Sequence, residues 1–491
     1  MGDPSFRSRF AILGSGASTA TPWLQCVIGQ RRCGVCSDCI ERPNSSRNLR
    51  NNPSALLSLA PRGGGAPRHV MIDAGKTMRA SVSRWFPLLR VRDLSAVILT
   101  HPHADAMLGL DDLRDIAPRR LLPVYLSREC LEVVRRSFTY LVPKGSVAAR
   151  AEEFGYGVAH EEAPASAAPG GAAATTFVAM IEWRVFDAWV PFVIPEADGC
   201  LVVPVPVQHG VGPGNLSFAF EFGARVDFLS ERALSLSAAA AAAEASVAIP
   251  PSAPLPFLVA PPQAPLSDLL GPASASCDVE ELACAAAYSD EEDNTETTDA
   301  LPTQLSAQPG ANPDAVDTHV IAQLPSLPGS RVLYISDVSA LSTAARAYFR
   351  SRAVNLLIVD LLSYSRYSTH FSAAQSFNCA ADIRAKVTRF VGINHCLAHD
   401  IEHARFQALG RAIAAGPLDI GLAYDGCAWS LDLPPLSLAT LRANVEAVRR
   451  AAEPLEVRKD VDYAVPVLAE LALEASPTRV RDAARGATQN R

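Results

Sequence analysis

Histidine and aspartate alternate within residues 100–112, THPHADAMLGLDD. His101 ends an apolar, β-branched segment at 95–101, and His103 and Asp105 follow at alternate positions. A tight turn with this spacing can direct two imidazoles and a carboxylate at one point, and this donor set suits zinc, manganese or iron. We therefore predict a metal-binding turn, with an accidental polar turn as the alternative.

Further candidate ligands stand at the ends of other apolar segments. His209 ends the segment 202–209, Asp337 ends 331–337 and His395 ends 388–395, while Asp73 follows 68–72. Short runs rich in β-branched residues predict strands, and residues 76–89 between two of them have helical spacing. The sequence therefore predicts a sheet scaffold that presents these side chains from loops along one edge.

Four cysteines fall within fourteen residues: Cys26, Cys33, Cys36 and Cys39. The C-x2-C-x2-C spacing is a strong zinc signature in an intracellular chain. The alternative is a set of four reduced cysteines without metal.

Composition limits the classes of protein. The net charge of −7 over 491 residues gives no global basic field, which counts against sequence-independent nucleic-acid binding. No apolar run is long enough to span a bilayer, so a cytoplasmic protein without a membrane partner is expected. There is no G-x-S-x-G motif and no P-loop, so serine hydrolase and nucleoside triphosphatase activities lack support.

Low-complexity segments interrupt the pattern of strands. Residues 143–176 are rich in Ala, Gly and Glu, and residues 233–328 in Ala, Pro, Ser and acidic residues. Neither has sustained periodicity, so both are predicted to be flexible or disordered insertions. Strand-like segments resume after each one, which indicates a single interrupted domain over 9–432, followed by a helical tail at 437–491.

The order of motifs resembles the metallo-β-lactamase superfamily: IDAG (72–75), THPHAD (100–105), QHG (208–210), SD (336–337) and NH (394–395). LGSGASTATPWLQC (13–26), CGVCSDC (33–39), NPSALL (52–57) and IDAGKTMR (72–79) are similar to a narrower branch. That branch contains the cyclic phosphodiesterase of the bacterial carbon–phosphorus lyase pathway and its eukaryotic relatives. The resemblance implies an α/β fold, an αββα sandwich, with a two-metal hydrolase site at one edge of the paired sheets.

The resemblance also implies roles for the candidate ligands. The first metal would be held by His101, His103 and His209. Asp337 would bridge the two metals, and Asp105 and His395 would hold the second metal. Asp73 would be a buried group that organises the turn, and the alternative is a strand-end cap.

Ala106 departs from the family pattern, because the phosphodiesterase has a second-site histidine at this place. Two alternatives follow. Either Asp111 or Asp112 supplies a substitute ligand, or the second ion binds weakly or not at all. The two aspartates could instead be negative charges favoured at the start of a helix. The sequence leaves open whether the active site holds one ion or two.

The same resemblance implies a structural zinc site held by three cysteines and a histidine. Cys33 and Cys36 match best, the third cysteine is Cys26 or Cys39, and His399 is the expected fourth ligand. The cofactors predicted are thus a structural Zn²⁺ and one or two Zn²⁺ or Mn²⁺ ions in the active site.

The predicted function is hydrolysis of a small or cyclic phosphodiester by metal-activated water. Asp105 and His370 are the candidate catalytic residues. His370 matches the family's general acid, and the alternative is a surface or helix-capping histidine. Lys76 and Arg47 are candidate phosphate contacts. Other classes are a transfer-RNA 3′-processing nuclease, disfavoured by the lack of a basic arm, and a non-catalytic metal-stabilised scaffold. The sequence is compatible with a homodimer.

Overall fold

A computed structural model describes the protein over residues 6–62, 65–116, 121–142, 149–150, 180–210, 216–225, 330–413 and 416–433, and at positions 443, 446 and 447. The predicted insertion at 233–328 lies outside the described residues. So do the insertion at 143–176, apart from a strand at 149–150, and the tail at 437–491, apart from the three positions above.

The described residues form two β-sheets. The first sheet has eight strands in the order β15 (Ala428–Ser430), β1 (Arg9–Gly14), β2 (Ser54–Leu59), β3 (Arg68–Ile72), β4 (Ala96–Ile98), β5 (Leu122–Leu126), β7 (Ile181–Val185) and β6 (Ala149–Arg150). The second has seven strands in the order β14 (Asp419–Leu422), β13 (Val387–Val391), β12 (Leu356–Asp360), β11 (Val332–Ile335), β10 (Leu216–Arg225), β9 (Cys200–Gln208) and β8 (Phe192–Ile194). The apolar strands predicted before Asp73, His101, His209, Asp337 and His395 are all present, as β3, β4, β9, β11 and β13.

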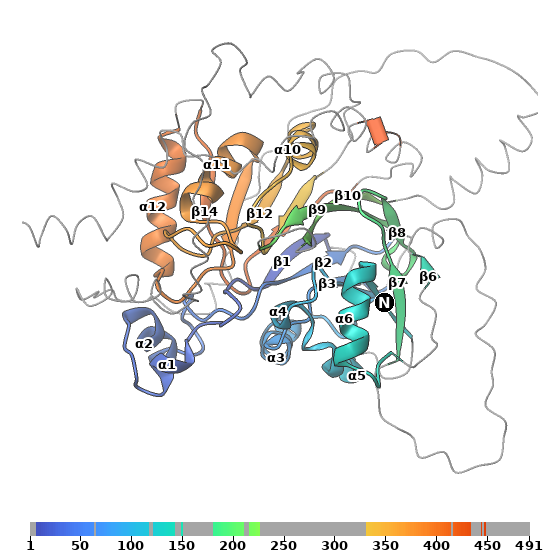
Figure 1. Cartoon of the computed structure of the whole chain (residues 1–491), viewed down its shortest axis with the longest axis horizontal. Helices are drawn as coiled ribbons and strands as arrows, with labels where there is room; N and C mark the ends of the chain where they lie inside the picture. The colour runs from blue at the N-terminus through green and yellow to red at the C-terminus, as the bar shows by residue number, and fades with distance from the viewer. Residues whose placement is uncertain are drawn as a thin grey trace, which may run out of the picture.

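Helices cover the outer faces of both sheets (Figure 1). The first sheet is covered by α3 (Met78–Leu88), α4 (Ala104–Met107), α5 (Leu113–Ile116) and α6 (Arg128–Ser137). The second is covered by α10 (Thr343–Arg350), α11 (Ala373–Ile383) and α12 (His399–Arg411). Two short helices, α1 (Leu24–Val27) and α2 (Gly34–Glu41), lie at the end of the molecule near α12.

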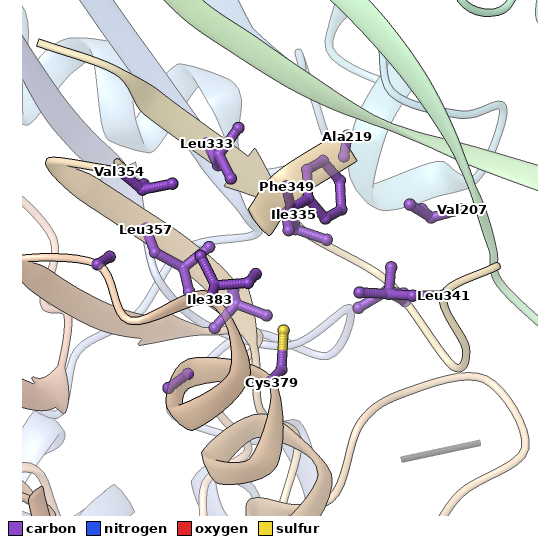
Figure 2. Close-up of a cluster of buried hydrophobic side chains, with 14 of the residues drawn as sticks. Val207, Ala219, Leu333, Ile335, Leu341, Phe349, Val354, Leu357, Cys379 and Ile383 are labelled. Atoms are coloured by element: carbon purple, nitrogen blue, oxygen red, sulfur yellow. The ribbon is translucent and has the colours of Figure 1, made fainter. Parts of the chain in front are cut away.

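Successive apolar side chains of a strand point to opposite faces of its sheet, and they form three separate hydrophobic layers, one between the sheets and one on the outer face of each sheet. In β11, Tyr334 packs between the two sheets, whereas Leu333 and Ile335 face the helices outside. Successive side chains of a strand point to opposite faces, so a strand that is apolar throughout can serve two layers. Figure 2 shows the outer layer, where Leu333 and Ile335 meet Phe349 of α10 and Ile383 of α11. The predicted αββα sandwich is confirmed.

The carboxyl ends of β4 and β11 meet at one edge of the sandwich. β3 and β4 run parallel, as do β11, β12 and β13. A hydrogen bond from the Phe218 N–H to the Thr100 carbonyl, 3.1 Å, joins the first residues of β10 to the segment between β4 and His101. This edge therefore receives the residues that follow β3, β4, β9 and β11.

The opposite edge receives the ends of the longest segment outside the described residues. β10 and β11 are antiparallel, with Phe222 opposite Val332, so residues 226–329 leave and return where β10 ends and β11 begins. In the described part of the chain, no helix combines the length and apolar character needed to cross a bilayer.

Candidate metal centres and active site

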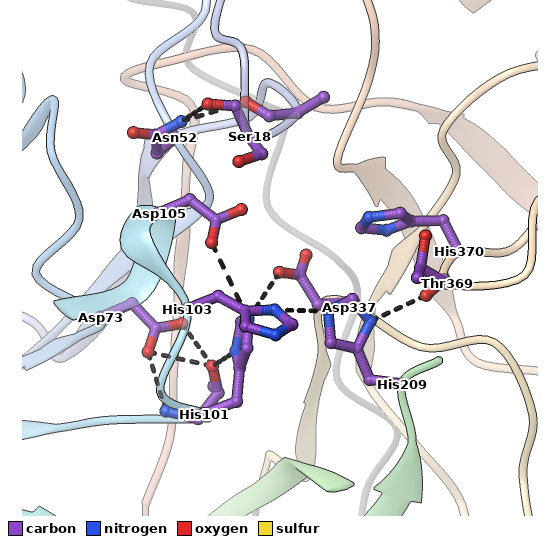
Figure 3. A network of polar contacts seen from close by, with 12 residues as sticks. Ser18, Asn52, Asp73, His101, His103, Asp105, His209, Asp337, Thr369 and His370 are labelled. Carbon is purple, nitrogen blue, oxygen red and sulfur yellow. Dashed lines mark hydrogen bonds and ion pairs between the residues drawn. The ribbon is translucent and has the colours of Figure 1, made fainter. Parts of the chain in front are cut away.

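Three imidazoles converge at the predicted edge (Figure 3). His101 and His103 lie on the turn between β4 and α4, and His209 directly follows β9. His103 Nδ1 lies 3.0 Å from His209 Nε2, and the ring centroids of the three residues are 4.7 to 4.9 Å apart. His101 and His209 are buried, while His103 reaches the surface. We call these three residues the imidazole cluster.

Hydrogen bonds set the tautomers of the two buried imidazoles. The Thr100 hydroxyl donates to the Asp73 carboxylate at 2.9 Å, so its oxygen must accept from His101 Nδ1, 2.8 Å away. The Thr369 carbonyl can only accept, so His209 Nδ1 carries the proton of that 2.7 Å contact. In the neutral ring each Nε2 therefore keeps a free lone pair, which is the form that binds a metal. For His101, burial is outweighed by the neighbouring Asp337 carboxylate, which raises the pKa of the ring and favours its protonated form until a cation takes the place of that proton.

Asp73 holds this turn from behind, the place in which it was predicted. It also accepts the Thr100 backbone N–H at 2.8 Å. Both Asp73 (φ 60°) and Asp337 (φ 49°) adopt the left-handed backbone conformation, which costs a residue with a side chain of order 1 kcal/mol or more. Such strain at two carboxylates beside one cluster is typical of a functional site.

Two buried carboxylates flank His101. Asp337 follows β11 and its Oδ2 lies 3.2 Å from His101 Nε2; Asp105 lies in α4 and its Oδ1 is 3.8 Å from the same atom. Burial opposes ionisation, but pairing with His101 holds the pKa of Asp337 well below its usual range. Burial also lowers the pKa of His209 to about 3, so this imidazole stays neutral.

Asp360 is a site residue that the sequence analysis did not assign. It is the last residue of β12, and its Oδ2 lies 2.9 Å from His370 Nδ1 and accepts the Phe371 N–H at 3.2 Å. Burial lowers the pKa of His370, but Asp360 outweighs it and raises that pKa to about 9. The rings of His370 and His209 lie 5.1 Å apart. An acidic residue at the end of a buried strand, as at Asp73 and Asp337, was the signal that could have found it.

The cysteine-rich segment forms a second cluster. Cys26, Cys33, Cys36 and His395 lie with their donor atoms within 4.8 Å of one another. His395 Nδ1 is 3.9, 3.5 and 3.6 Å from the three sulfur atoms in that order, and all four residues are buried. We call these four residues the cysteine cluster.

His395 therefore does not lie where the family resemblance put it, at a second active-site metal. The backbone before it is bonded to the N-terminal segment: Ile393 N–H donates to Ser15, and Arg50 donates to the Asn394 carbonyl at 2.9 Å. These contacts carry the loop after β13 toward the cysteines. The imidazole also packs on Trp23, with ring centroids 4.7 Å apart.

Two other expected zinc ligands lie outside the cysteine cluster. His399 opens α12, where its buried ring stacks on His403 at 5.4 Å. Cys39 lies one helical turn beyond Cys36, and its sulfur is 3.9 Å from the Ser46 hydroxyl. The third cysteine of the predicted zinc site is therefore Cys26 and not Cys39, since only Cys26 lies in the cysteine cluster. His395 occupies the position of the fourth ligand, which was expected for His399.

Neither candidate substitute for the missing histidine reaches the imidazole cluster. Asp111 pairs with Arg114 and accepts from the Tyr140 hydroxyl, while Asp112 pairs with Arg79. Ala106 is buried, and its carbonyl accepts the Ala74 N–H at 2.7 Å. The segment after Ala106 is thus held by its own surface ion pairs.

The two candidate phosphate contacts, Lys76 and Arg47, differ in whether their charged groups already have partners. Lys76 is exposed. Arg47 pairs with Asp400 at 3.2 Å and lies over the Tyr424 ring, 5.1 Å from its centroid. The guanidinium of Arg47 is therefore engaged with α12 and the residues after β14.

The donor atoms of both clusters fit divalent metal ions. His101 Nε2, Asp105 Oδ1 and Asp337 Oδ1 are buried without a hydrogen-bond partner among the described residues, an arrangement that is costly unless a cation lies between them. Three thiols with one imidazole are a usual ligand set of structural zinc. Burial and the neighbouring Cys33 raise the pKa of Cys26 to about 11, and a cation would favour the thiolate.

Comparison with known proteins defines the class to which this site belongs. Residues 68–233, which include the imidazole cluster and Asp105, match the model of the beta-lactamase superfamily domain. With the αββα sandwich, this match confirms the predicted superfamily for residues 68–233, about a third of the chain.

Three solved structures are similar to this chain at low sequence identity and with TM-scores below 0.5. A diphosphatase from the PhnP family is 18% identical with a TM-score of 0.47 (87% of this chain, 99% of that chain). The metallo-β-lactamase fold protein YhfI from Bacillus subtilis is 11% identical, with a TM-score of 0.40 (86% and 99%). Human tRNase Z, short form, is 12% identical, with a TM-score of 0.38 (87% and 100%).

One curated protein shares a segment of sequence. The octanoyltransferase of Porphyromonas gingivalis is 31% identical over 136 residues, which are 28% of this chain. The match spans only 24% of that protein's length, so its name says nothing about the activity of this chain.

Proposed function

We propose that this chain hydrolyses a small or cyclic phosphodiester and that His370 donates the proton to the leaving oxygen. The observation that carries the proposal is the placement of the His370–Asp360 pair beside the imidazole cluster. The imidazole cluster would hold a divalent ion, which would supply an acidified water and offset charge on a phosphoryl oxygen. Asp360 accepts from His370 Nδ1, which leaves Nε2–H of the imidazolium as the donor.

The imidazole cluster and the cysteine cluster would have different roles. His101, His103 and His209 would hold the active-site ion, and Asp73 orients His101 through Thr100. The cysteine cluster would hold a structural zinc that ties α1 and α2 to the loop after β13. The ligands come from α1, from the first turn of α2 and from the loop after β13, so this ion would contribute to folding and not to turnover.

A leaving-group comparison tests the role of His370. His370→Gln should lower kcat by about 10²–10⁴-fold for an ester with an alkoxide leaving group. The loss should be much smaller for a p-nitrophenyl ester, since p-nitrophenolate leaves without protonation. Asp360→Asn should show the same pattern, and zinc content should stay at the wild-type value in both variants. His403→Gln removes an imidazole of α12 and serves as the control.

The outcomes separate the classes of function. Equal losses for both esters would mean that His370 does not donate the proton. Metal-loaded wild-type protein that turns over no phosphodiester would favour the scaffold. Cleavage of a transfer-RNA precursor, with no turnover of small esters, would favour the nuclease.

A further inference from the structure

A polar turn follows β1 and has no role yet in the proposed function. The Ala20 N–H donates to the Ala17 carbonyl at 2.8 Å, which places Ser18 and Thr19 at the centre of the turn. Ala20 adopts the left-handed backbone conformation, with φ 59°, and such strain in a residue with a side chain is often found at functional sites. The Ser18 turn, as we call residues 17–20, is therefore a candidate binding element.

Hydrogen bonds from two distant segments fix the Ser18 turn. Asn52, which precedes β2 and is buried, donates from Nδ2 to the carbonyls of Ala17 and Ser18, at 3.1 and 2.9 Å. The Ala17 N–H donates to the Ile393 carbonyl, beyond β13, at 3.1 Å. Because both carbonyls bonded to Asn52 can only accept, the orientation of its amide is fixed. The backbone of the turn is thus held by the fold.

The same contacts place the Ser18 turn beside the candidate active site. The Asn52 backbone N–H donates to the Thr77 hydroxyl at 2.8 Å, and the adjacent Lys76 N–H donates to the carbonyl of Ala104 at 3.2 Å. Ala104 directly precedes Asp105 in α4. Figure 3 shows the Ser18 side chain on the side of its turn that faces Asp105. A hydroxyl group therefore points toward the edge at which the candidate metal ligands gather.

The Ser18 turn presents hydrogen-bond donors that are not used within the described part of the chain. The Ser18 hydroxyl and the backbone N–H groups of Ser18 and Thr19 have no hydrogen-bond partner there. Ser18 is half-buried and Thr19 is exposed. Unused N–H groups of a turn are suited to bind an anion. Since the Asp105 carboxylate lies nearby, an anion would also need the ion of the imidazole cluster to offset that charge.

We propose that the Ser18 turn is a subsite for one non-bridging phosphoryl oxygen of the substrate, to which the Ser18 hydroxyl donates a hydrogen bond. A phosphodiester has two such oxygens, and the ion of the imidazole cluster would offset charge on the other. A donor that the fold already holds in place stabilises developing charge without reorganisation. The inference rests on the proposed function, which supplies the phosphodiester, and it makes the site selective for one stereoisomer at phosphorus.

Calorimetric titration of the zinc-loaded protein with inorganic phosphate tests the subsite without reference to turnover. Ser18→Ala should weaken phosphate binding by about 10- to 100-fold, the range expected when a hydrogen bond to a charged group is lost. Zinc content and Tm should stay at the wild-type values, because the hydroxyl has no partner among the described residues. Ser137→Ala, at the exposed end of α6, is the matched control and should bind phosphate as the wild type does.

The separated Rp and Sp isomers of a phosphorothioate diester test which oxygen Ser18 contacts. Sulfur accepts hydrogen bonds weakly, so Ser18→Ala should cost little for the isomer with sulfur at the Ser18 turn. For the other isomer kcat/KM should fall by about 10- to 100-fold.

Two results would overturn the proposal: equal phosphate affinity in wild type and Ser18→Ala, or equal losses of kcat/KM for the two isomers. Phosphate binding that depends on Ser18, in a protein that turns over no phosphodiester, would support the subsite and count against the proposed function alone.

Discussion

At the scale of single residues, the candidate site depends on close backbone packing behind its ligands. Gly75 follows β3 and faces the turn that carries Asp105. A Cβ at Gly75 would lie 1.7 Å from the Asp105 carbonyl oxygen. Gly109 repeats the motif, since its Cβ would lie 2.5 Å from the Gly75 carbonyl. The turn at α4 can therefore pack closely against the residues after β3 only because Gly75 and Gly109 have no side chains.

Gly75→Ala should thus displace the α4 turn. We expect a loss of stability of about 1–3 kcal/mol, typical of overpacking, in urea unfolding. Binding of metal at Asp105 should weaken as well. Gly223→Ala, in β10, is the control, because its Cβ would meet its nearest neighbour at 3.6 Å. Wild-type stability in Gly75→Ala would show that the turn is not constrained in this way.

At the scale of elements, one buried charge network joins three elements of the second sheet layer. Glu221 of β10 lies on the apolar outer face, 2.9 Å from Arg331, just before β11, and 2.6 Å from Arg352, after α10. Burial alone would raise its pKa, but the two guanidinium groups lower the pKa of Glu221 to about 2. The network therefore holds β10, β11 and α10 together at the end of the sandwich opposite the site.

Glu221→Gln should destabilise the protein by about 3–5 kcal/mol near neutral pH, because it leaves two buried guanidinium groups without their partner. The folded-state pKa of about 2 lies below the ordinary 4.5, so the carboxylate stabilises fully above pH 4.5. That stabilisation disappears as the pH falls toward 2. Wild type and variant should therefore converge across this window in chemical unfolding.

Glu132→Gln, in a surface pair with Arg135 on α6, is the control and should cost less than about 1 kcal/mol. A stability difference for Glu221→Gln that is as large at pH 3 as at pH 7 would contradict the assignment of the pKa shift to this network.

At the scale of the whole molecule, the longest segment outside the described residues attaches away from the candidate site. Residues 226–329 connect β10 and β11 at the edge opposite the imidazole cluster. The two ends lie close together, since a Cβ at Gly223 would be 3.7 Å from the Ser330 carbonyl oxygen. A short turn could make the same connection.

Replacing residues 233–326 with a short Gly/Ser linker should therefore preserve the fold, zinc content and turnover. Each halving of loop length lowers the entropic cost of closure by about 0.6 kcal/mol, so stability should rise slightly. Thermal unfolding and metal analysis would check this. Loss of turnover, with metal content unchanged, would show instead that the segment reaches the site.

The sequence by itself determined the main strands and the edge at which ligands would gather. Strand propensity is local, so the strands can be predicted from short segments of sequence. Parallel strands place the residues that follow them at one edge, so the sequence predicts that His101, His103 and His209 lie close together. The C-x2-C spacing likewise identified Cys33 and Cys36, two of the four residues of the cysteine cluster.

Only the tertiary structure decided which cluster each remaining histidine joins. His395 follows a strand just as His209 does, yet its loop turns toward the cysteines, because Ile393 donates a hydrogen bond to the distant Ser15 carbonyl and Arg50 donates one to Asn394. The pairing of Asp360 with His370 likewise joins a strand end to a loop ten residues later. These outcomes depend on contacts between segments far apart in the chain, which local periodicity does not encode.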